Sequence, residues 1–305
     1  MSASTISSPA TTPAGDPETQ RLRQQARTRR SVKKIVFHAA LLVATAVVLY
    51  PALWMFMSAL KPSNQIIGNV SLLPEDPSWT NFSTALQGIG GVSFWTFLLN
   101  STILAVLTVV GILVSCSLSA YALARLDFPG RNIWFAIMIG TLLLPFHVVI
   151  IPQYIVFNEL GLVNTFVPLL VGKFLATDAF FVFLMVQFMR NLPRELDEAA
   201  RIDGAGHTRI FTSIMLPLMK PALVTSSIFA FIWSWNDFFG PLLYLKDPDL
   251  ATLPIALRLF VDQTSVSDYG AQMAMAVLAL VPVLLFFVIF QRYLVEGVAT
   301  QGLKG

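Results

Sequence analysis

Long apolar runs separated by short polar segments follow one another along almost the whole 305-residue chain. Several of these runs approach or exceed the ~20 residues that a helix needs to cross ~30 Å of hydrocarbon. They lack the short alternation of apolar and polar residues that is typical of strands in a membrane β-barrel. The pattern therefore predicts an all-α integral membrane protein with six transmembrane helices, at about residues 35–59, 95–123, 132–156, 165–189, 222–244 and 271–293.

Two prolines interrupt the third of these spans. The third span contains Pro145 and Pro152. Because proline removes a backbone hydrogen bond and clashes with the preceding turn, a kink is expected there.

The composition agrees with a membrane location. Hydrophobic residues make up 55% of the chain and charged residues 12%, with a mean hydropathy of +0.70. A soluble domain of this length needs a polar shell that such a composition cannot supply. The single cysteine, Cys116, lies in an apolar run and is expected to be a small buried hydrophobe, since it has no partner for an intrachain disulfide.

The positive charges indicate the orientation of the chain. With the amino terminus inside, sixteen Lys and Arg residues fall in cytoplasmic segments and three in external loops. This bias predicts that both termini are cytoplasmic. We expect residues 1–34 to form a disordered basic tail, residues 35–293 a six-helix domain, and residues 294–305 a second cytoplasmic tail. The largest internal loop is then 190–221.

That internal loop contains the stretch ELDEAARIDGAG, at residues 195–206. Pro193 suits the first position of a helix, whose positive end would favour the carboxylates that follow. Asp197 precedes Arg201 by four residues, which favours an ion pair along the helix. Gly204 is placed to end the helix in a left-handed cap. The stretch therefore predicts a short acidic helix followed by a tight turn.

A second short helix is expected after the turn. Thr208 can cap it, and its apolar side would be formed by Ile210, Phe211, Ile214 and Met215. The first helix would place Leu196, Ala199, Ala200 and Asp203 on one shallow face. The spacing alone leaves two interpretations open: a solvated loop packed on its own bundle, or a platform on which another protein docks.

The residues of this loop also resemble a known motif. Glu198-Ala199-Ala200, Asp203-Gly204-Ala205, Phe211 and Leu216-Pro217 are similar to the EAA motif of ATP-binding-cassette (ABC) importer permeases. The resemblance covers nearly the whole chain outside the amino-terminal tail. Further stretches resemble sugar-importer permeases of the maltose type, in particular the smaller permease partner: Pro74 with 79–82, 120–125 with 128–131, 151–154 with 161–164, 235–237 with 240–242, and 291–305.

The resemblance implies a type I, maltose-type permease bundle in a bacterial or archaeal cytoplasmic membrane. The chain would be the subunit that translocates a sugar or sugar derivative. Its implied partners are a second homologous permease, two cytoplasmic ATPase subunits and an extracytoplasmic solute-binding protein. The sequence does not identify the sugar.

The resemblance also assigns roles to the residues of the motif. In this family the EAA helices sit in a cleft on each ATPase subunit and carry its closing motion into the membrane. Glu198 would make the polar contact, Ala199 and Ala200 would allow close approach, and Asp203 would brace the turn set by Gly204. The residues expected to couple to the ATPase are Glu198, Ala199, Ala200, Asp203, Gly204, Ala205, Phe211, Leu216 and Pro217.

The chain itself is not expected to be an enzyme. It has no G-x-x-x-x-G-K-[ST] phosphate loop, so ATP and Mg²⁺ are expected to bind to the partner ATPases. No metal-ligand cluster or nucleophile triad is evident, since the three histidines, His38, His147 and His207, are widely separated. We therefore expect no cofactor and no metal in this chain.

Four polar residues inside the predicted spans are candidates for the transport path. They are Lys173 and Asp178 in the fourth span, and Asn236 and Asp237 in the fifth. Ionisable groups at membrane depth usually face a bundle interior or an aqueous cavity, where they could bind sugar hydroxyls. Helix packing or snorkelling to the interface is the alternative. On a continuous helix Lys173 and Asp178 would lie about 140° apart and would not form an obvious pair.

Two other functions are alternatives to an importer permease. An ion-coupled secondary transporter would need inverted repeats and a complete coupling-ion site in one chain. An intramembrane enzyme would need a paired catalytic constellation at matched depth. The sequence shows neither feature.

Overall fold

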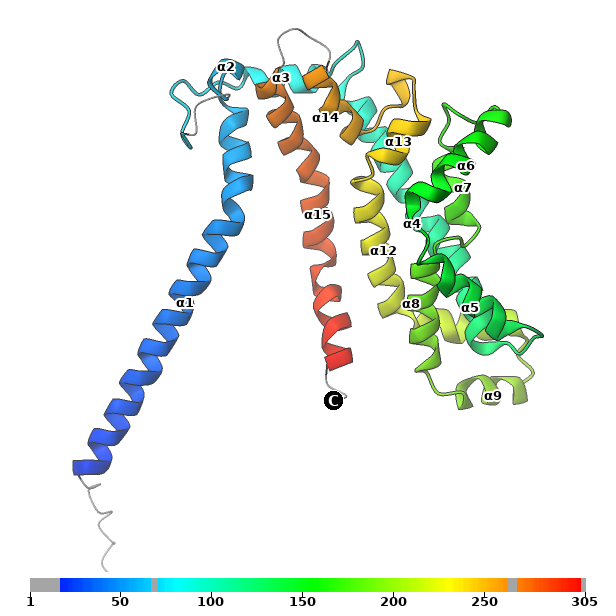
Figure 1. The fold of residues 1–305 in the computed structure, drawn as a ribbon. Helices are drawn as coiled ribbons and strands as arrows, with labels where there is room; N and C mark the ends of the chain where they lie inside the picture. Colours follow the sequence, from blue (N-terminus) through cyan, green and yellow to red (C-terminus); the bar gives the residue numbers. More distant parts are fainter. Residues whose placement is uncertain (1–16, 67–70, 263–267, 303–305) are drawn as a thin grey trace, which may run out of the picture. The chain divides into compact units, whose positions relative to one another are not determined.

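The computed structural model of the chain describes residues 17–66, 71–262 and 268–302. Within these ranges the regular elements are helices, apart from one isolated bridge between Ile89 and Val92 (Figure 1). The prediction of an all-α fold is confirmed.

The helices differ widely in length, and several predicted spans are divided between two of them. Their bounds are α1 Pro17–Ala59, α2 Ser63–Ile66, α3 Thr80–Gln87, α4 Phe94–Arg125, α5 Arg131–Thr141, α6 Phe146–Glu159, α7 Val167–Phe174, α8 Ala179–Arg190, α9 Glu195–Ile202, α10 His207–Ile210, the π-helical turn η1 Phe211–Met215, α11 Leu216–Leu218, α12 Lys220–Trp235, α13 Phe239–Tyr244, the 3-10 turn η2 Pro248–Leu250, α14 Leu253–Asp262 and α15 Tyr269–Gly302.

Four helical stretches are long and apolar enough to cross a membrane: Val32–Ala59, Phe94–Arg125, Val167–Arg190 and Tyr269–Gln291. Two further pairs of helices qualify only if each bent pair is one span. Residues 131–141 and 146–159 meet at 99°, and residues 207–218 and 220–235 meet at 74°. The described chain thus has four to six candidate spans.

The chain divides into two compact units, residues 1–54 and 55–305. The first unit contains most of α1, whose apolar side chains from Val32 to Leu53 are exposed. The helix already begins at Pro17, so the expectation of a disordered tail is wrong for residues 17–34. This stretch is rich in Arg, Gln and Lys, which favour helix. Residues 1–16 lie outside the described part of the chain.

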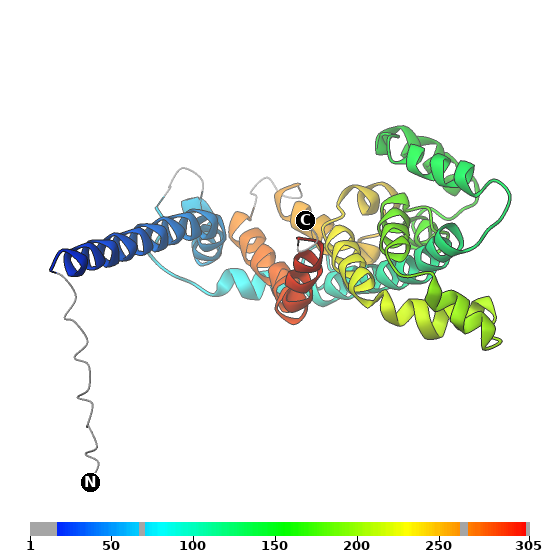
Figure 2. The same cartoon turned by 90° about the horizontal axis from the view of Figure 1, so that it is seen from below.

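The second unit is organised around α4. This helix packs against α7, α8 and α12, and α12 in turn packs against α15. Figures 1 and 2 show α12 and α15 side by side. One apolar core joins the start of α4 to α3, α12, α14 and α15. A second joins the later part of α4, including the buried Cys116, to α8 and the helices that follow it.

Three predicted spans differ in detail from the structure. The third is kinked as predicted, since its break ends at Pro145, while Pro152 lies inside α6. The fourth breaks between Phe174 and Ala179, where Ala176 has a positive φ of 55°. The fifth ends at Trp235, not at 244, and the sixth continues to Gly302, so residues 294–302 are helical as well.

Candidate functional site: the acidic knuckle and a polar pocket

Residues 195–218 form the predicted pair of short helices, which we call the acidic knuckle. The first helix, α9, has Glu195, Asp197 and Glu198 in its first turn. The turn after it is closed by a bond from the Ala205 amide to the Ala200 carbonyl, at 2.9 Å. Gly204 has φ of +78°, so the predicted left-handed residue is confirmed.

Two predicted details of the knuckle are wrong. The first helix begins at Glu195 and not at Pro193, with Arg194 as its preceding residue. The second begins after Gly206, so Thr208 lies inside it and does not cap it. Gly206, with φ of −75° and ψ of 168°, takes the extended geometry of the N-cap position, which leaves Thr208 as the second residue of the helix.

The knuckle has one buried side and one exposed side. Of the apolar side predicted for the second helix, Ile210, Phe211 and Met215 are buried and Ile214 is partly buried. Of the face expected on the first helix, Leu196, Ala199 and Asp203 are exposed and only Ala200 is buried.

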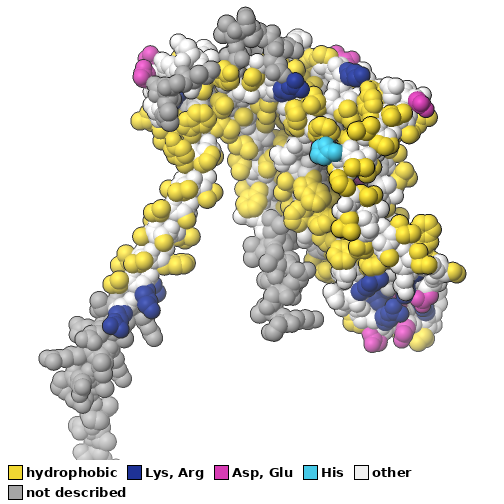
Figure 3. Space-filling model, viewed as in Figure 1, with side chains coloured by type: hydrophobic (Ala, Val, Ile, Leu, Met, Phe, Trp, Pro, Cys, Tyr) yellow, Lys and Arg dark blue, Asp and Glu magenta, His cyan; other side chains and the backbone are white. Residues whose placement is uncertain are grey.

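Charged groups gather around the exposed side of the knuckle. Figure 3 shows acidic and basic side chains together at the end of the second unit where α9 lies. Glu195 and Glu198 are exposed, and so is Ile202, whose exposed fraction of 87% is high for an isoleucine. The same short helix thus exposes carboxylates and one large apolar side chain.

Asp197 does not form the predicted pair with Arg201. It is buried, and its Oδ2 lies 3.1 Å from Nη1 of Arg125, at the end of α4. Helix spacing favoured Arg201 because that residue is near in sequence, but tertiary packing turns Asp197 toward the bundle. Sequence reasoning assigned Arg125 no role. The signal available was a basic residue at the end of a long apolar helix.

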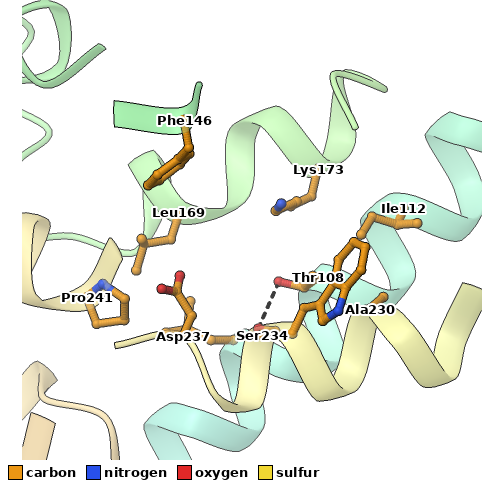
Figure 4. Close-up of a pocket in the computed structure, with 11 residues that line it drawn as sticks. Thr108, Ile112, Phe146, Leu169, Lys173, Ala230, Ser234, Asp237 and Pro241 are labelled. Carbon is orange, nitrogen blue, oxygen red and sulfur yellow. Dashed lines mark hydrogen bonds between the residues drawn. The ribbon is translucent and has the colours of Figure 1, made fainter. Parts of the chain in front are cut away.

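A pocket of about 260 Å³ lies among α4, α7 and α12, with contributions from the starts of α6 and α13. Figure 4 shows Lys173 of α7 and Asp237, in the connection between α12 and α13, projecting toward the same space. The lining residues are Leu104, Thr108, Ile112, Phe146, Leu169, Lys173, Ala230, Trp233, Ser234, Asp237 and Pro241.

Lys173 and Asp178 form an ion pair, with 3.0 Å between Nζ and Oδ1. The expectation that they do not pair is wrong, because they do not lie on one continuous helix. The break around Ala176 turns the chain back so that Asp178, which precedes α8, reaches the lysine at the end of α7. Lys173 is thereby held at the wall of the pocket.

The two candidates from the fifth span separate. Asp237 lines the pocket, and its Oδ1 accepts a hydrogen bond of 3.0 Å from the Gly240 amide. Asn236 does not line the pocket, and its amide donates to the Ile232 carbonyl at 2.8 Å. This difference follows from the end of α12, since both residues lie in the connection to α13 and point in different directions.

Sequence reasoning missed the small polar residues of the pocket. The Ser234 hydroxyl donates to Thr108 Oγ1 at 3.3 Å, which joins α12 to α4 at the pocket wall. Trp233 also lines the pocket and packs against Phe180 and Phe181. The sequence does contain a signal for Ser234 and Thr108, since each is a hydroxyl residue inside an apolar run. The site therefore offers an ammonium, a carboxylate, hydroxyls and an aromatic ring within one small cavity.

Comparison with known proteins assigns this architecture to a family. Residues 111–300 match the family model described as the binding-protein-dependent transport system inner membrane component. The chain belongs to this family. It is therefore a permease subunit, and the resemblance to ABC importer permeases is confirmed. The matched range contains the whole knuckle and most of the residues that line the pocket.

Relatives cover almost the full length of this permease. The arabinooligosaccharides transport system permease protein AraQ of Halalkalibacterium halodurans is 35% identical, over 85% of this chain and 92% of AraQ. The sn-glycerol-3-phosphate transport system permease protein UgpE of Brucella abortus is 34% identical, over 88% of this chain and 97% of UgpE.

A solved structure has the same fold as this permease. A chain from the crystal structure of a bacterial ABC transporter involved in the import of the acidic polysaccharide alginate aligns with a TM-score of 0.74 at 25% identity. The alignment covers 92% of this permease and 99% of that chain. This permease thus has the fold of an ABC importer permease, which is a membrane-embedded protein.

Proposed function

We propose that this permease moves a sugar or sugar derivative across a bacterial or archaeal cytoplasmic membrane. An extracytoplasmic binding protein would deliver the solute, and two cytoplasmic ATPase subunits would bind ATP with Mg²⁺ and drive the transport. The observation that carries the proposal is the acidic knuckle, an exposed charged element on a chain whose long helices expose mainly apolar side chains. The relatives named for arabinooligosaccharides and sn-glycerol-3-phosphate support a polyhydroxylated solute.

The proposed topology has six spans, with both termini in the cytoplasm. It counts residues 131–159 as one bent span and takes α12 alone as the fifth span, and it is supported by the excess of Lys and Arg in the segments assigned to the inner side. Residues 35–293 would form the permease domain, with the loop 190–221 beneath the membrane. The exposed apolar side chains of α15, which include Leu284 and Phe287, offer a face for lipid or for a second homologous permease.

In the proposed coupling, the exposed side of the knuckle docks on an ATPase subunit. Glu198 would supply a charged contact, and the small side chain of Ala199 would let the partner approach the helix backbone. Asp203 would act at the turn that Gly204 sets, because its backbone already ends α9. No ATP-binding motif occurs in this chain, so nucleotide and Mg²⁺ belong to the partner.

The remaining motif residues would support this docking face from behind. Ala200 and Phe211 are buried, so their proposed role is to seat the knuckle on the bundle and not to touch the ATPase. Ala205 and Leu216 are partly buried in the same apolar core, and Pro217 lies in the last turn before the bend into α12. The motif would thus contain both contacting and seating residues.

The pocket is proposed as part of the solute path. Sugar hydroxyls both donate and accept hydrogen bonds, so the Asp237 carboxylate and the Lys173 ammonium can each bind one. Trp233 adds an aromatic face to the same cavity. Pockets of this kind combine an apolar lining with a few convergent polar groups. Asn236 is not included, because its side chain bonds its own helix.

Reconstitution tests the proposed function. The permease would be purified with its second permease and its ATPase subunits and placed in liposomes. ATP would be supplied on the side of the membrane where the ATPase subunits lie. We expect the binding protein to stimulate ATP hydrolysis and uptake of one solute from a panel that includes arabinooligosaccharides and glycerol 3-phosphate. Uptake by the lone permease without any ATPase subunit would contradict the proposal.

Replacing Gly204 by valine is expected to weaken assembly with the ATPase. The added Cβ meets no atom within 4 Å, so the cost comes from the φ of +78° alone. A side chain in this left-handed region costs ~1–2 kcal/mol, and a β-branched one is especially unfavourable. The measurement is the amount of ATPase subunit that co-purifies, together with the thermal unfolding of the permease.

The matched control is Gly206→Val, two residues further along the same turn. Gly206 has open space around it as well, but its φ of −75° is an ordinary value for any residue. We expect co-purification to fall with Gly204→Val and to be largely retained with Gly206→Val. Equal co-purification for Gly204→Val and the unaltered permease would defeat the prediction.

A further inference from the structure

The cytoplasmic end of α4 is fastened to the start of the acidic knuckle by one buried side chain. Arg125 Nη1 lies 3.1 Å from Asp197 Oδ2 on α9, and the exposed fractions of the two side chains are 2% and 8%. Nη2 of the same guanidinium donates to the carbonyls of Met189 and Leu192, at 2.6 and 2.9 Å. Arg125 therefore joins three elements at once: α4, the end of α8 and the beginning of α9.

The same end of α4 also holds the second helix of the knuckle. The ring of Tyr121, one helical turn before Arg125, packs on the ring of Phe211 with 5.3 Å between centroids. Its hydroxyl lies 3.5 Å from Nδ1 of His207. Because both halves of the knuckle contact one helix end, the knuckle and α4 are expected to move together.

The other contacts of α4 lead to the pocket. The helix runs without a proline from Phe94 to Arg125, and its residues Thr108 and Ile112 line the pocket. Ile112 lies about 20 Å from Arg125 along the helix axis, at 1.5 Å per residue. Between them, the Ser115 hydroxyl donates at 2.6 Å to the carbonyl of Lys173, whose side chain also lines the pocket. An unbroken series of contacts thus connects Asp197 to the pocket wall.

We propose that Arg125 is a positioning residue that transmits the movement of the knuckle to α4 and through it to the pocket. This inference rests on the proposed function, in which the knuckle receives motion from an ATPase. Motion of a surface helix reaches a distant site only through packed elements that move as a body. Burial shields the Arg125–Asp197 pair from salt, and its several bonds fix the angle between α4 and α9 more firmly than one bond could.

The alternative is that the Arg125–Asp197 pair only stabilises the fold, and the experiment has to distinguish this role from transmission. Removing one partner of a buried ion pair is strongly destabilising, whereas replacing both by apolar groups is often neutral. If the pair only stabilises the fold, the double variant Arg125→Met/Asp197→Leu should restore both assembly and transmission. If the pair transmits motion, the double variant should restore assembly alone. Arg125→Lys keeps the charge but loses the fork that reaches three acceptors, so it should transmit only in part.

The experiment measures transmission at the pocket, with Mg-ATP and a maleimide as the only probes. Ser234→Cys places a thiol in the pocket, and Cys116→Ala removes the native thiol. The rate of maleimide labelling is measured in the complex with both permeases, the ATPases and the binding protein, with and without Mg-ATP. ATP hydrolysis is recorded on the same samples. The matched control is Arg131→Met, which breaks an ion pair with Asp127 that is largely exposed on the aspartate side.

We expect Mg-ATP to change the labelling rate about tenfold when Arg125 is present, a typical size for coupling between sites. With Arg125→Met and with the double variant, the change should fall below about twofold while ATP hydrolysis continues, and Arg131→Met should leave it intact. A full Mg-ATP response in the assembled double variant would overturn the proposed role of Arg125. If Mg-ATP has no effect even with Arg125 present, the proposed function itself fails.

Discussion

Glu198→Lys is expected to leave the permease correctly inserted in the membrane while solute uptake falls by about tenfold to a hundredfold. Glu198 is exposed on α9, so its replacement disturbs no buried contact of the bundle. On the proposed docking face, however, it places a positive charge where the ATPase meets a carboxylate. Like charges brought together at an interface cost several kcal/mol, and each 1.4 kcal/mol corresponds to about a tenfold loss of binding.

The measurements are uptake and ATP hydrolysis on the same purified complex. We expect ATP hydrolysis to persist but to be uncoupled from uptake, so that less solute is transported for each ATP hydrolysed. Glu159→Lys provides a control with the same charge change, since Glu159 is also exposed but lies at the end of α6, far along the chain from the knuckle. Normal uptake by a correctly inserted Glu198→Lys permease would show that Glu198 does not contribute to the docking face.

Lys173→Met is expected to lower both the stability of the permease and its uptake. The change leaves Asp178 without its ion-pair partner and leaves Asp237 as the other charge at the pocket. Since the pair is a quarter to a third exposed, we expect a loss of about 2 kcal/mol, which is less than for a fully buried pair. Thermal unfolding in detergent measures this loss.

The double variant Lys173→Met/Asp178→Leu separates packing from transport. It removes both charges, so the stability should largely return to that of the unaltered permease. If the ammonium binds solute, uptake should stay about tenfold lower, as expected for the loss of a charged hydrogen bond of about 1.5–3 kcal/mol. Uptake that recovers together with stability would show that Lys173 has only a packing role.

Local chemistry was sufficient to predict much of the fold from the sequence. Apolar runs long enough to cross a bilayer correspond to helices because a chain in lipid must satisfy its backbone internally. Gly204 was predicted to be left-handed because glycine is the residue that enters this region without strain. Pro145 marks the predicted break of the third span.

The pocket was harder to predict, because its geometry depends on breaks that carry no local signal. Residues 175–178 contain neither glycine nor proline, yet the chain turns there with a positive φ at Ala176. That turn creates the pair between Lys173 and Asp178. The end of α12 at Trp235 is likewise set by side chains that bond the backbone, including Asn236 and Asp237.

The burial of Asp197 could not be predicted from neighbouring residues at all. On an isolated helix its best partner is Arg201, four residues later. In the folded permease the end of α4 provides Arg125 instead, with two carbonyls of the α8–α9 region already bound to it. Only the packing of elements distant in sequence determines this choice.

Cross-linking from the exposed side of α9 examines whether the acidic knuckle docks on an ATPase. Ala199→Cys, combined with Cys116→Ala, places a single reactive thiol on that side of the helix. A short thiol-reactive photo-cross-linker attached there should join the permease to the ATPase subunit, and the yield should change when Mg-ATP is added. Labelling of the same thiol by a membrane-impermeant reagent from outside intact cells, without any adduct to the ATPase, would contradict a cytoplasmic coupling surface.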